Sequence, residues 1–153
     1  MAGIHRILVP IDFSPCSKSA AEYALFLAEK TGATIDLVYV WEPPVFLGPE
    51  FFEGVHKERN LSLSEVAHGN ALQTLNEFAQ EIPIPDDAKV RPKVVSGRVH
   101  EEILALAASE GYDLVVMGTH GRKGLAHLLL GSETEKVIRE ASCPVVVVHE
   151  GVN

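Results

Sequence analysis

Short apolar runs alternate with longer amphipathic segments along this chain, and the alternation constrains the fold more than any other feature. The apolar runs predict strands over residues 4–11, 34–41, 89–96, 112–117 and 144–149. The amphipathic segments predict helices over residues 15–31, 61–82, 99–109 and 132–141. Strands separated by helices pair in parallel through right-handed crossovers, with helices on both faces of the sheet. Residues 1–153 are therefore predicted to form one doubly wound α/β domain.

Residues typical of helix ends support these boundaries. Ser14 is a predicted N-cap followed by Pro15, and Gly32 is a predicted C-terminal stop. Residues 42–60 mix prolines, glycines and aromatic residues, which predicts a long irregular loop. Such a loop either folds over a site or is held against the core by its aromatic side chains.

A glycine-rich stretch over residues 117–124, followed by Gly131-Ser132, is the main candidate for a ligand site. It follows an apolar strand and precedes a helix, with the spacing Gly118-x2-Gly121-x9-Gly131-Ser132. Glycines let a backbone come close to a ligand, and N–H groups at a helix N-terminus favour an anion. The spacing differs from the phosphate loop of nucleoside triphosphatases and from the dinucleotide-binding fingerprint.

Three stretches together resemble the universal stress protein family, specifically its ATP-binding branch. They are the glycine spacing, the opening Ile7-Leu8-Val9-Pro10-Ile11-Asp12-Phe13-Ser14, and the ending Pro144-Val145-Val146-Val147-Val148. The resemblance covers essentially the whole chain and implies the strand order 3-2-1-4-5. In that order a ligand binds where the C-terminal ends of strands 1 and 4 separate, which are the positions of Asp12 and Gly118.

The resemblance also implies which residues hold an adenine nucleotide. The nucleoside end is assigned to Pro10, Ile11, Asp12 and Val40. The ribose and phosphates are assigned to Met117, Gly118, His120, Gly121, Arg122, Gly131, Ser132, Glu133 and Thr134. The residues themselves leave simpler roles open: Asp12 as a turn residue, Ser132 as a helix N-cap, and Arg122 as a solvated charge.

Glu133 departs from the family pattern, because ATP-binding relatives commonly carry a small apolar residue at this position. An acidic residue in the first turn of a helix is favourable to the helix dipole. Directed toward the loop, however, the carboxylate would repel a triphosphate unless a divalent cation lay between them. The sequence leaves the direction of this side chain open.

Composition limits the partners that the surface can attract. The net charge is −8, which argues against nucleic acid and anionic membranes as general partners but not against one small nucleotide. No apolar run approaches the length of about 20 residues that spans a bilayer, and no signal peptide is evident. Cys16 and Cys143 do not form a disulfide framework, so a reducing cytoplasm is expected. Cys16 is expected to fill the start of a helix as a small side chain.

The predicted function is that of a regulatory stress-response module that binds ATP, or ADP or AMP, with Mg²⁺. The residues that would surround the phosphates include no evident water-activating base, so slow or no hydrolysis and no dedicated enzyme activity are expected. Two alternatives stay open: a nucleotide-free stress-protein dimer, and an adenine-nucleotide-dependent enzyme of the wider adenine-binding α/β group. No spacing typical of metal ligands occurs among the seven histidines.

The last predicted strand indicates a homodimer. Val145–Val148 is an unbroken apolar run, and an exposed edge strand of this kind favours pairing with another chain. A strand buried on both faces predicts the same run. Members of the resembled family commonly dimerise through this strand.

Overall fold

A parallel sheet forms the centre of the protein, in the computed structural model that describes residues 3–43, 63–120 and 130–151. Its strand order is β3-β2-β1-β4-β5, which confirms the predicted order. The strands are β1 (Arg6–Pro10), β2 (Thr34–Trp41), β3 (Val90–Ser96), β4 (Leu114–Gly118) and β5 (Val145–Val148). The helices among the described residues are α1 (Pro15–Thr31), α3 (Leu63–Gln80), α4 (Val99–Ser109) and α5 (Ser132–Glu140).

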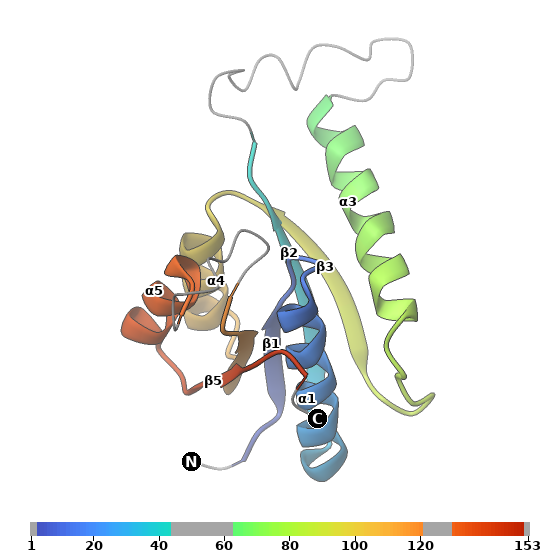
Figure 1. Ribbon diagram of the computed structural model, residues 1–153, viewed down its shortest axis with the longest axis vertical. Helices are drawn as coiled ribbons and strands as arrows, with labels where there is room; N and C mark the ends of the chain where they lie inside the picture. The colour runs from blue at the N-terminus through green and yellow to red at the C-terminus, as the bar shows by residue number, and fades with distance from the viewer. Residues whose placement is uncertain (1–2, 44–62, 121–129, 152–153) are drawn as a thin grey trace.

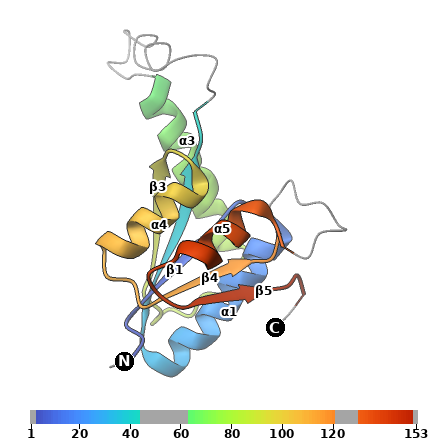
Figure 2. The ribbon, with the colours of Figure 1, turned by 90° about the vertical axis from the view of Figure 1, so that its left-hand side faces the viewer.

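The helices lie in two layers, with α1 and α3 on one face of the sheet and α4 and α5 on the other (Figures 1 and 2). Successive residues of a strand point to opposite faces, so each strand contributes to two cores. Ile7, Val9 and Leu37 belong to the core beneath α1 and α3. Leu8 and Val38 belong to the core beneath α4 and α5. Both faces of the central strands are therefore covered, as expected for a doubly wound sheet.

Helix α1 begins and ends at the residues that the sequence indicates. The Ser14 hydroxyl oxygen accepts a hydrogen bond from Ser17 N–H, and Pro15 occupies the first helical position. Gly32 adopts a left-handed backbone (φ 75°), and its N–H donates to Ala28 O at 2.7 Å. Small buried residues between these ends let the helix lie close to the sheet.

The predicted boundaries of α1, β2 and α4 coincide with the observed ones, and those of the other elements differ by at most two residues. Helix α3 ends at Gln80 rather than Ile82, because its last residues form tighter bonds, from Glu81 N–H to Phe78 O and from Ile82 N–H to Ala79 O. The predicted helix start at residues 61 and 62, like most of the predicted loop 42–60, lies outside the described residues.

Strands β1 and β4 separate at their C-terminal ends. Their register pairs Ile7 with Leu114 and Leu8 with Val115, whereas the strands continue to Pro10 and Gly118. This is the topological switch point, where the chain changes from building one half of the sheet to building the other. The predicted ligand position therefore coincides with an observed divergence of two neighbouring strands.

Within the described residues, no helix combines the length and the apolar character that crossing a bilayer requires.

Candidate functional site

Gly118 ends β4 directly against the start of α1. A Cβ atom added at Gly118 would lie 2.6 Å from the Cβ atom of Cys16 and 2.9 Å from its carbonyl carbon. These distances are too short for any side chain, so glycine is required for α1 to pack this closely against β4. Cys16 is buried at this contact, as the sequence indicated for a small side chain at a helix start.

The glycine-rich segment leaves and re-enters the fold at neighbouring points. Gly131 N–H donates to Thr119 O at 2.7 Å, which joins the backbone on the two sides of residues 120–130. The Thr134 hydroxyl donates to Gly118 O at 2.8 Å and ties the first turn of α5 to the end of β4. Two hydrogen bonds therefore hold the N-terminus of α5 at the switch point.

Two helix N-termini meet at this edge of the sheet. The first turn of α1 packs against Gly118, and the first turn of α5 bonds to it through Thr134. The N-cap of α5 is Gly131, so Ser132 is the first helical residue rather than the N-cap that the sequence allowed. Its side chain is exposed. The dipoles of the two helices, together with the N–H groups at the start of α5, make this edge favourable for an anion.

Asp12 and Ile11 occupy the turn that follows β1. Ile11 is buried, and its N–H donates to Val38 O at 2.8 Å. The Asp12 carboxylate accepts a hydrogen bond from Ser14 N–H at 3.0 Å. Asp12 therefore fulfils the turn role that the sequence left open, and its half-buried position at the switch point leaves a ligand role compatible with that turn.

The backbone of Val40 faces the gap beyond the end of β1. Val38 O bonds to Ile11 on the β1 side, whereas Trp41 O accepts from Gly97 N–H on the β3 side at 3.0 Å. Peptide groups alternate sides along a strand, so those of Val40 face the same side as those of Val38. The Val40 side chain is buried in the core beneath α4, which leaves the backbone as its contribution to a site.

Glu133 is directed to helix α4. Its carboxylate accepts a hydrogen bond from His100 N–H at 2.8 Å and lies 2.9 Å from His100 Nδ1. The carboxylate is thus occupied at the start of α4, and the direction that the sequence left open is settled toward that helix.

The structure brings most of the predicted site residues to one edge of the sheet. They lie at or just after the end of β1 (Pro10, Ile11 and Asp12), near the end of β2 (Val40), at or just after the end of β4 (Met117, Gly118 and His120), and at the N-cap and first turn of α5 (Gly131, Ser132, Glu133 and Thr134). Met117 contributes a buried side chain to the core beneath α4. Gly121 and Arg122 lie outside the described residues.

Sequence reasoning missed Thr119 and Phe13. The Thr119 hydroxyl lies 3.1 Å from His120 Nδ1 and 3.7 Å from Cys16 Sγ, and so connects β4 with α1. Its signal was a polar residue inside an otherwise glycine-rich motif. Phe13 has a left-handed backbone with φ 68°, and its signal was a bulky residue in a tight turn between Asp12 and Ser14.

No cluster of three metal-ligating side chains occurs within residues 3–43, 63–120 and 130–151.

Comparison with known proteins places the chain among relatives of similar length. Residues 3–149 match the model of the universal stress protein family. A universal stress protein of Thermus aquaticus is 37% identical over 144 residues, which are 94% of this chain and 97% of the relative.

Solved structures show the same fold. The structure of MJ0577, a protein of Methanocaldococcus jannaschii, aligns with a TM-score of 0.75 at 29% identity and covers 98% of this chain and 99% of that one. A universal stress protein solved in complex with cAMP aligns with a TM-score of 0.66 at 22% identity, over 98% of this chain and 100% of that one. Given its match to the family model over nearly its whole length and these similarities, the chain belongs to the universal stress protein family.

Proposed function

We propose that this protein binds ATP, or ADP or AMP, with Mg²⁺ at the C-terminal edge of the sheet. The observation that carries the proposal is the convergence of two helix N-termini on Gly118, at the point where β1 and β4 separate. The glycine spacing, which resembles that of the ATP-binding branch, and a fold relative solved with cAMP support an adenine nucleotide. Mg²⁺ would arrive with the phosphates, since it is usually held by phosphate oxygens and water.

In this proposal the nucleotide lies along the sheet edge from β2 to α5. The adenine edge would meet the peptide groups of Val40, and the Asp12 carboxylate would accept a hydrogen bond from the nucleoside. The phosphates would lie at the start of α5, against the N–H groups that follow Gly131 and the exposed Ser132 hydroxyl. Because the Glu133 carboxylate is bonded to α4, it leaves the phosphate end without direct repulsion from that group.

The same groups support binding without dedicated turnover. Hydrolysis requires a residue that orients or deprotonates the attacking water. Asp12 and Glu133, two carboxylates of this edge, each accept a backbone N–H bond and serve a turn or a helix end. We propose that the protein acts as a regulator in the stress response, as a homodimer in the reducing cytoplasm. A reducing compartment is compatible with Cys16 and Cys143, which are both free thiols.

The test is a pair of substitutions that add the same charge at different places. Ser132→Asp puts a carboxylate at the phosphate end, where an acidic residue suits the helix dipole and preserves the fold. Ser142→Asp adds the same charge at an exposed position after α5. We expect Ser132→Asp to weaken ATP binding by about tenfold or more through like-charge repulsion, and to leave adenosine binding unchanged. Ser142→Asp should bind ATP like the wild type.

Isothermal titration with Mg²⁺·ATP and with adenosine measures these affinities, and chromatography of the incubated nucleotide measures turnover. Absence of ATP binding in the wild type would favour the nucleotide-free dimer. Turnover near the value of about 10 s⁻¹ that is typical of enzymes would favour the enzyme alternative. Equal affinities of the two aspartate variants for ATP would move the phosphates away from α5.

A further inference from the structure

Phe13 holds a backbone conformation that its side chain disfavours. Its φ of 68° makes it the one non-glycine residue with a positive φ among the described residues. This left-handed conformation brings Cβ close to the following carbonyl oxygen, and it is a clear outlier for a bulky residue. Surrounding contacts must therefore hold it in place.

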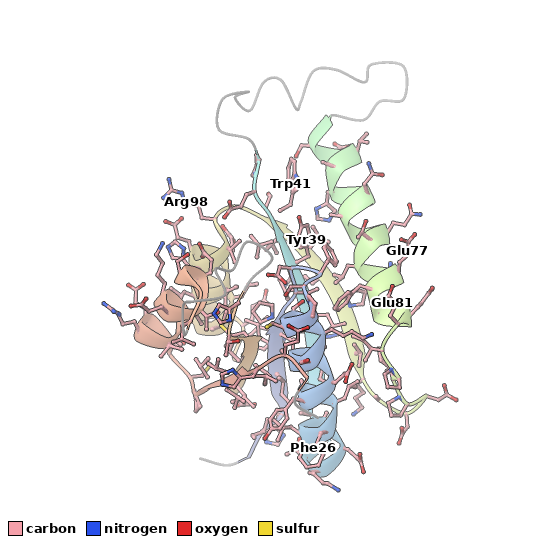
Figure 3. All side chains as sticks on the ribbon, viewed as in Figure 1. Phe26, Tyr39, Trp41, Glu77, Glu81 and Arg98 are labelled. Atoms are coloured by element: carbon pink, nitrogen blue, oxygen red, sulfur yellow. The ribbon has the colours of Figure 1, made fainter. Side chains whose placement is uncertain are left out.

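Two aromatic side chains provide those contacts. The Phe13 ring lies 4.8 Å from the ring of Tyr39 on β2 and 5.7 Å from the ring of Phe78 on α3, measured between centroids. The Phe78 pair is edge-on at 68° and the Tyr39 pair is tilted by 37°, and both distances lie in the favourable range for aromatic pairs. Tyr39 lies on the side of β2 that faces α3 (Figure 3). The ring of Phe13 is thus packed between the sheet and α3.

The residues on either side of Phe13 depend on this conformation. The Asp12 carboxylate accepts Ser14 N–H across Phe13, and the Ser14 hydroxyl oxygen accepts Ser17 N–H at 3.2 Å to begin α1. A rotation of Phe13 to a negative φ would turn Asp12 away from Ser14 and break the first of these bonds. The aromatic contacts therefore fix the direction in which Asp12 leaves β1.

We propose that Phe13 is a positioning residue for the nucleoside end of the site, and that the packing of α3 on Phe13 controls nucleotide affinity through Asp12. The proposal rests on the proposed function of Asp12 as a nucleotide ligand. Phe78, on α3, would influence a ligand that it does not touch. Since coupling between two equilibria is reciprocal, nucleotide binding would in turn stabilise the packing of α3 against the turn.

A set of substitutions separates the ring from the backbone conformation. Phe13→Gly removes the ring and makes the left-handed conformation readily accessible, whereas Phe13→Ala removes the ring and leaves that conformation disfavoured. We expect Phe13→Ala to weaken Mg²⁺·ATP binding by about tenfold, Phe13→Gly to weaken it less, and Phe78→Ala to weaken it by about threefold, within the range of coupled neighbours. Phe26→Ala, at an exposed phenylalanine of α1, is the control and should bind like the wild type.

A double-mutant cycle with Asp12→Ala tests whether Phe13 acts through Asp12. In the Asp12→Ala background, Phe13→Ala should have no further effect on the dissociation constant, because the group that it positions is gone. An undiminished effect in that background would overturn the proposal. So would equal affinities of Phe13→Gly and Phe13→Ala, since a merely structural loss of the ring affects both variants alike.

Amide hydrogen exchange in the absence of nucleotide measures how firmly the turn at Phe13 is held, independently of ATP binding. Phe13→Ala and Phe78→Ala should accelerate exchange of the Ser14 and Ser17 amides, and Phe26→Ala should not. Unchanged exchange of these amides in the Phe13 variants would overturn the positioning role itself. Accelerated exchange in a protein that binds no adenine nucleotide would instead contradict the proposed function and leave the aromatic control of the turn established.

Discussion

Asp36 on β2 is a buried carboxylate, with 3% of the residue exposed, that accepts hydrogen bonds from three side chains. Arg91 Nε lies 2.7 Å from Oδ1, while Arg6 Nη2 at 2.9 Å and the Tyr112 hydroxyl at 2.5 Å contact Oδ2. The contacts join β1, β2, β3 and the segment that leads into β4, so they hold the sheet together at the end opposite the candidate site. Burial alone would raise the pKa of Asp36, but the hydrogen bonds from Arg91, Tyr112 and Arg6 outweigh it and lower the pKa.

Asp36→Asn should reduce the free energy of unfolding at pH 7 by about 2–3 kcal/mol, because it removes the charge that pairs with two arginines that keep partial solvent contact. The folded-state pKa is lowered, so this stabilisation is present above the ordinary Asp pKa of 3.8 and is lost as the pH falls below it. Urea denaturation at pH 7 and pH 3 should show a difference between wild type and variant that shrinks at the lower pH.

Glu135→Gln is the matched control for that experiment. It makes the same carboxylate-to-amide change in the exposed pair that Glu135 forms with Arg139 on α5, and such pairs contribute at most about 0.5 kcal/mol. A difference between wild type and Asp36→Asn that is constant from pH 7 to pH 3 would mean that the charge of Asp36 is not what stabilises the sheet.

The N-terminus of helix α4 is capped by side chains from other elements of the fold. Its N-cap residue, Arg98, makes no side-chain capping bond. The first N–H groups bond instead to carboxylates of other elements: Val99 N–H to Glu42 at 3.0 Å and His100 N–H to Glu133 at 2.8 Å. Carboxylates at a helix N-terminus satisfy unpaired donors and interact favourably with the helix dipole. Residues after β2 and on α5 thus stabilise the start of α4.

Glu133→Ala should therefore lower the free energy of unfolding by about 1 kcal/mol, the usual effect of losing a capping side chain, although α5 itself keeps its Gly131 cap. Glu133→Gln should lose less, since its amide oxygen still accepts the His100 N–H bond. Chemical denaturation of both variants beside Glu135→Ala measures the difference. If Glu133→Ala and Glu135→Ala unfolded at the same urea concentration, the bond to α4 would contribute nothing.

The elements that local chemistry defines were predictable, and those that depend on distant partners were not. Ser14, Pro15 and Gly32 act on their own neighbours, so the sequence shows both ends of α1. The caps of α4 come from residues 42 and 133, which no local pattern connects to it. The site follows the same division: the glycine spacing was visible in sequence, whereas the contact of Gly118 with Cys16 and the left-handed backbone of Phe13 appear only in three dimensions.

At the scale of the whole molecule, β5 is an edge strand of the sheet, and we expect it to form the interface of a homodimer. Pro144 O and Val148 O bond to β4, so the peptide groups of Val145 and Val147, which alternate with them, face away from the sheet. Val145, Val146 and Val147 are each half-buried in this chain. An apolar edge strand with outward-facing donors and acceptors favours pairing with a second copy.

Val147→Lys should convert a dimer to a monomer, because charge on an edge strand opposes pairing. Light scattering measures the mass, and circular dichroism checks that the fold is kept. Phe26→Lys, on the exposed side of α1, introduces the same charge away from β5 and should leave the mass unchanged. A wild type that scatters as a monomer at all concentrations would contradict the dimer, as would a Val147→Lys variant with the wild-type mass.

The bond between Gly131 N–H and Thr119 O has a consequence for insertions between these two residues. Because the chain leaves and re-enters the sheet edge at one point, residues 120–130 can lengthen or shorten while both anchors stay in place. Each doubling of the length of such a segment costs only about 0.6 kcal/mol of loop-closure entropy. The contacts of Asp36 lie at the opposite end of the sheet and are not affected. An insertion between these two anchors is therefore expected to leave the free energy of unfolding nearly unchanged, while it alters the residues next to the candidate site.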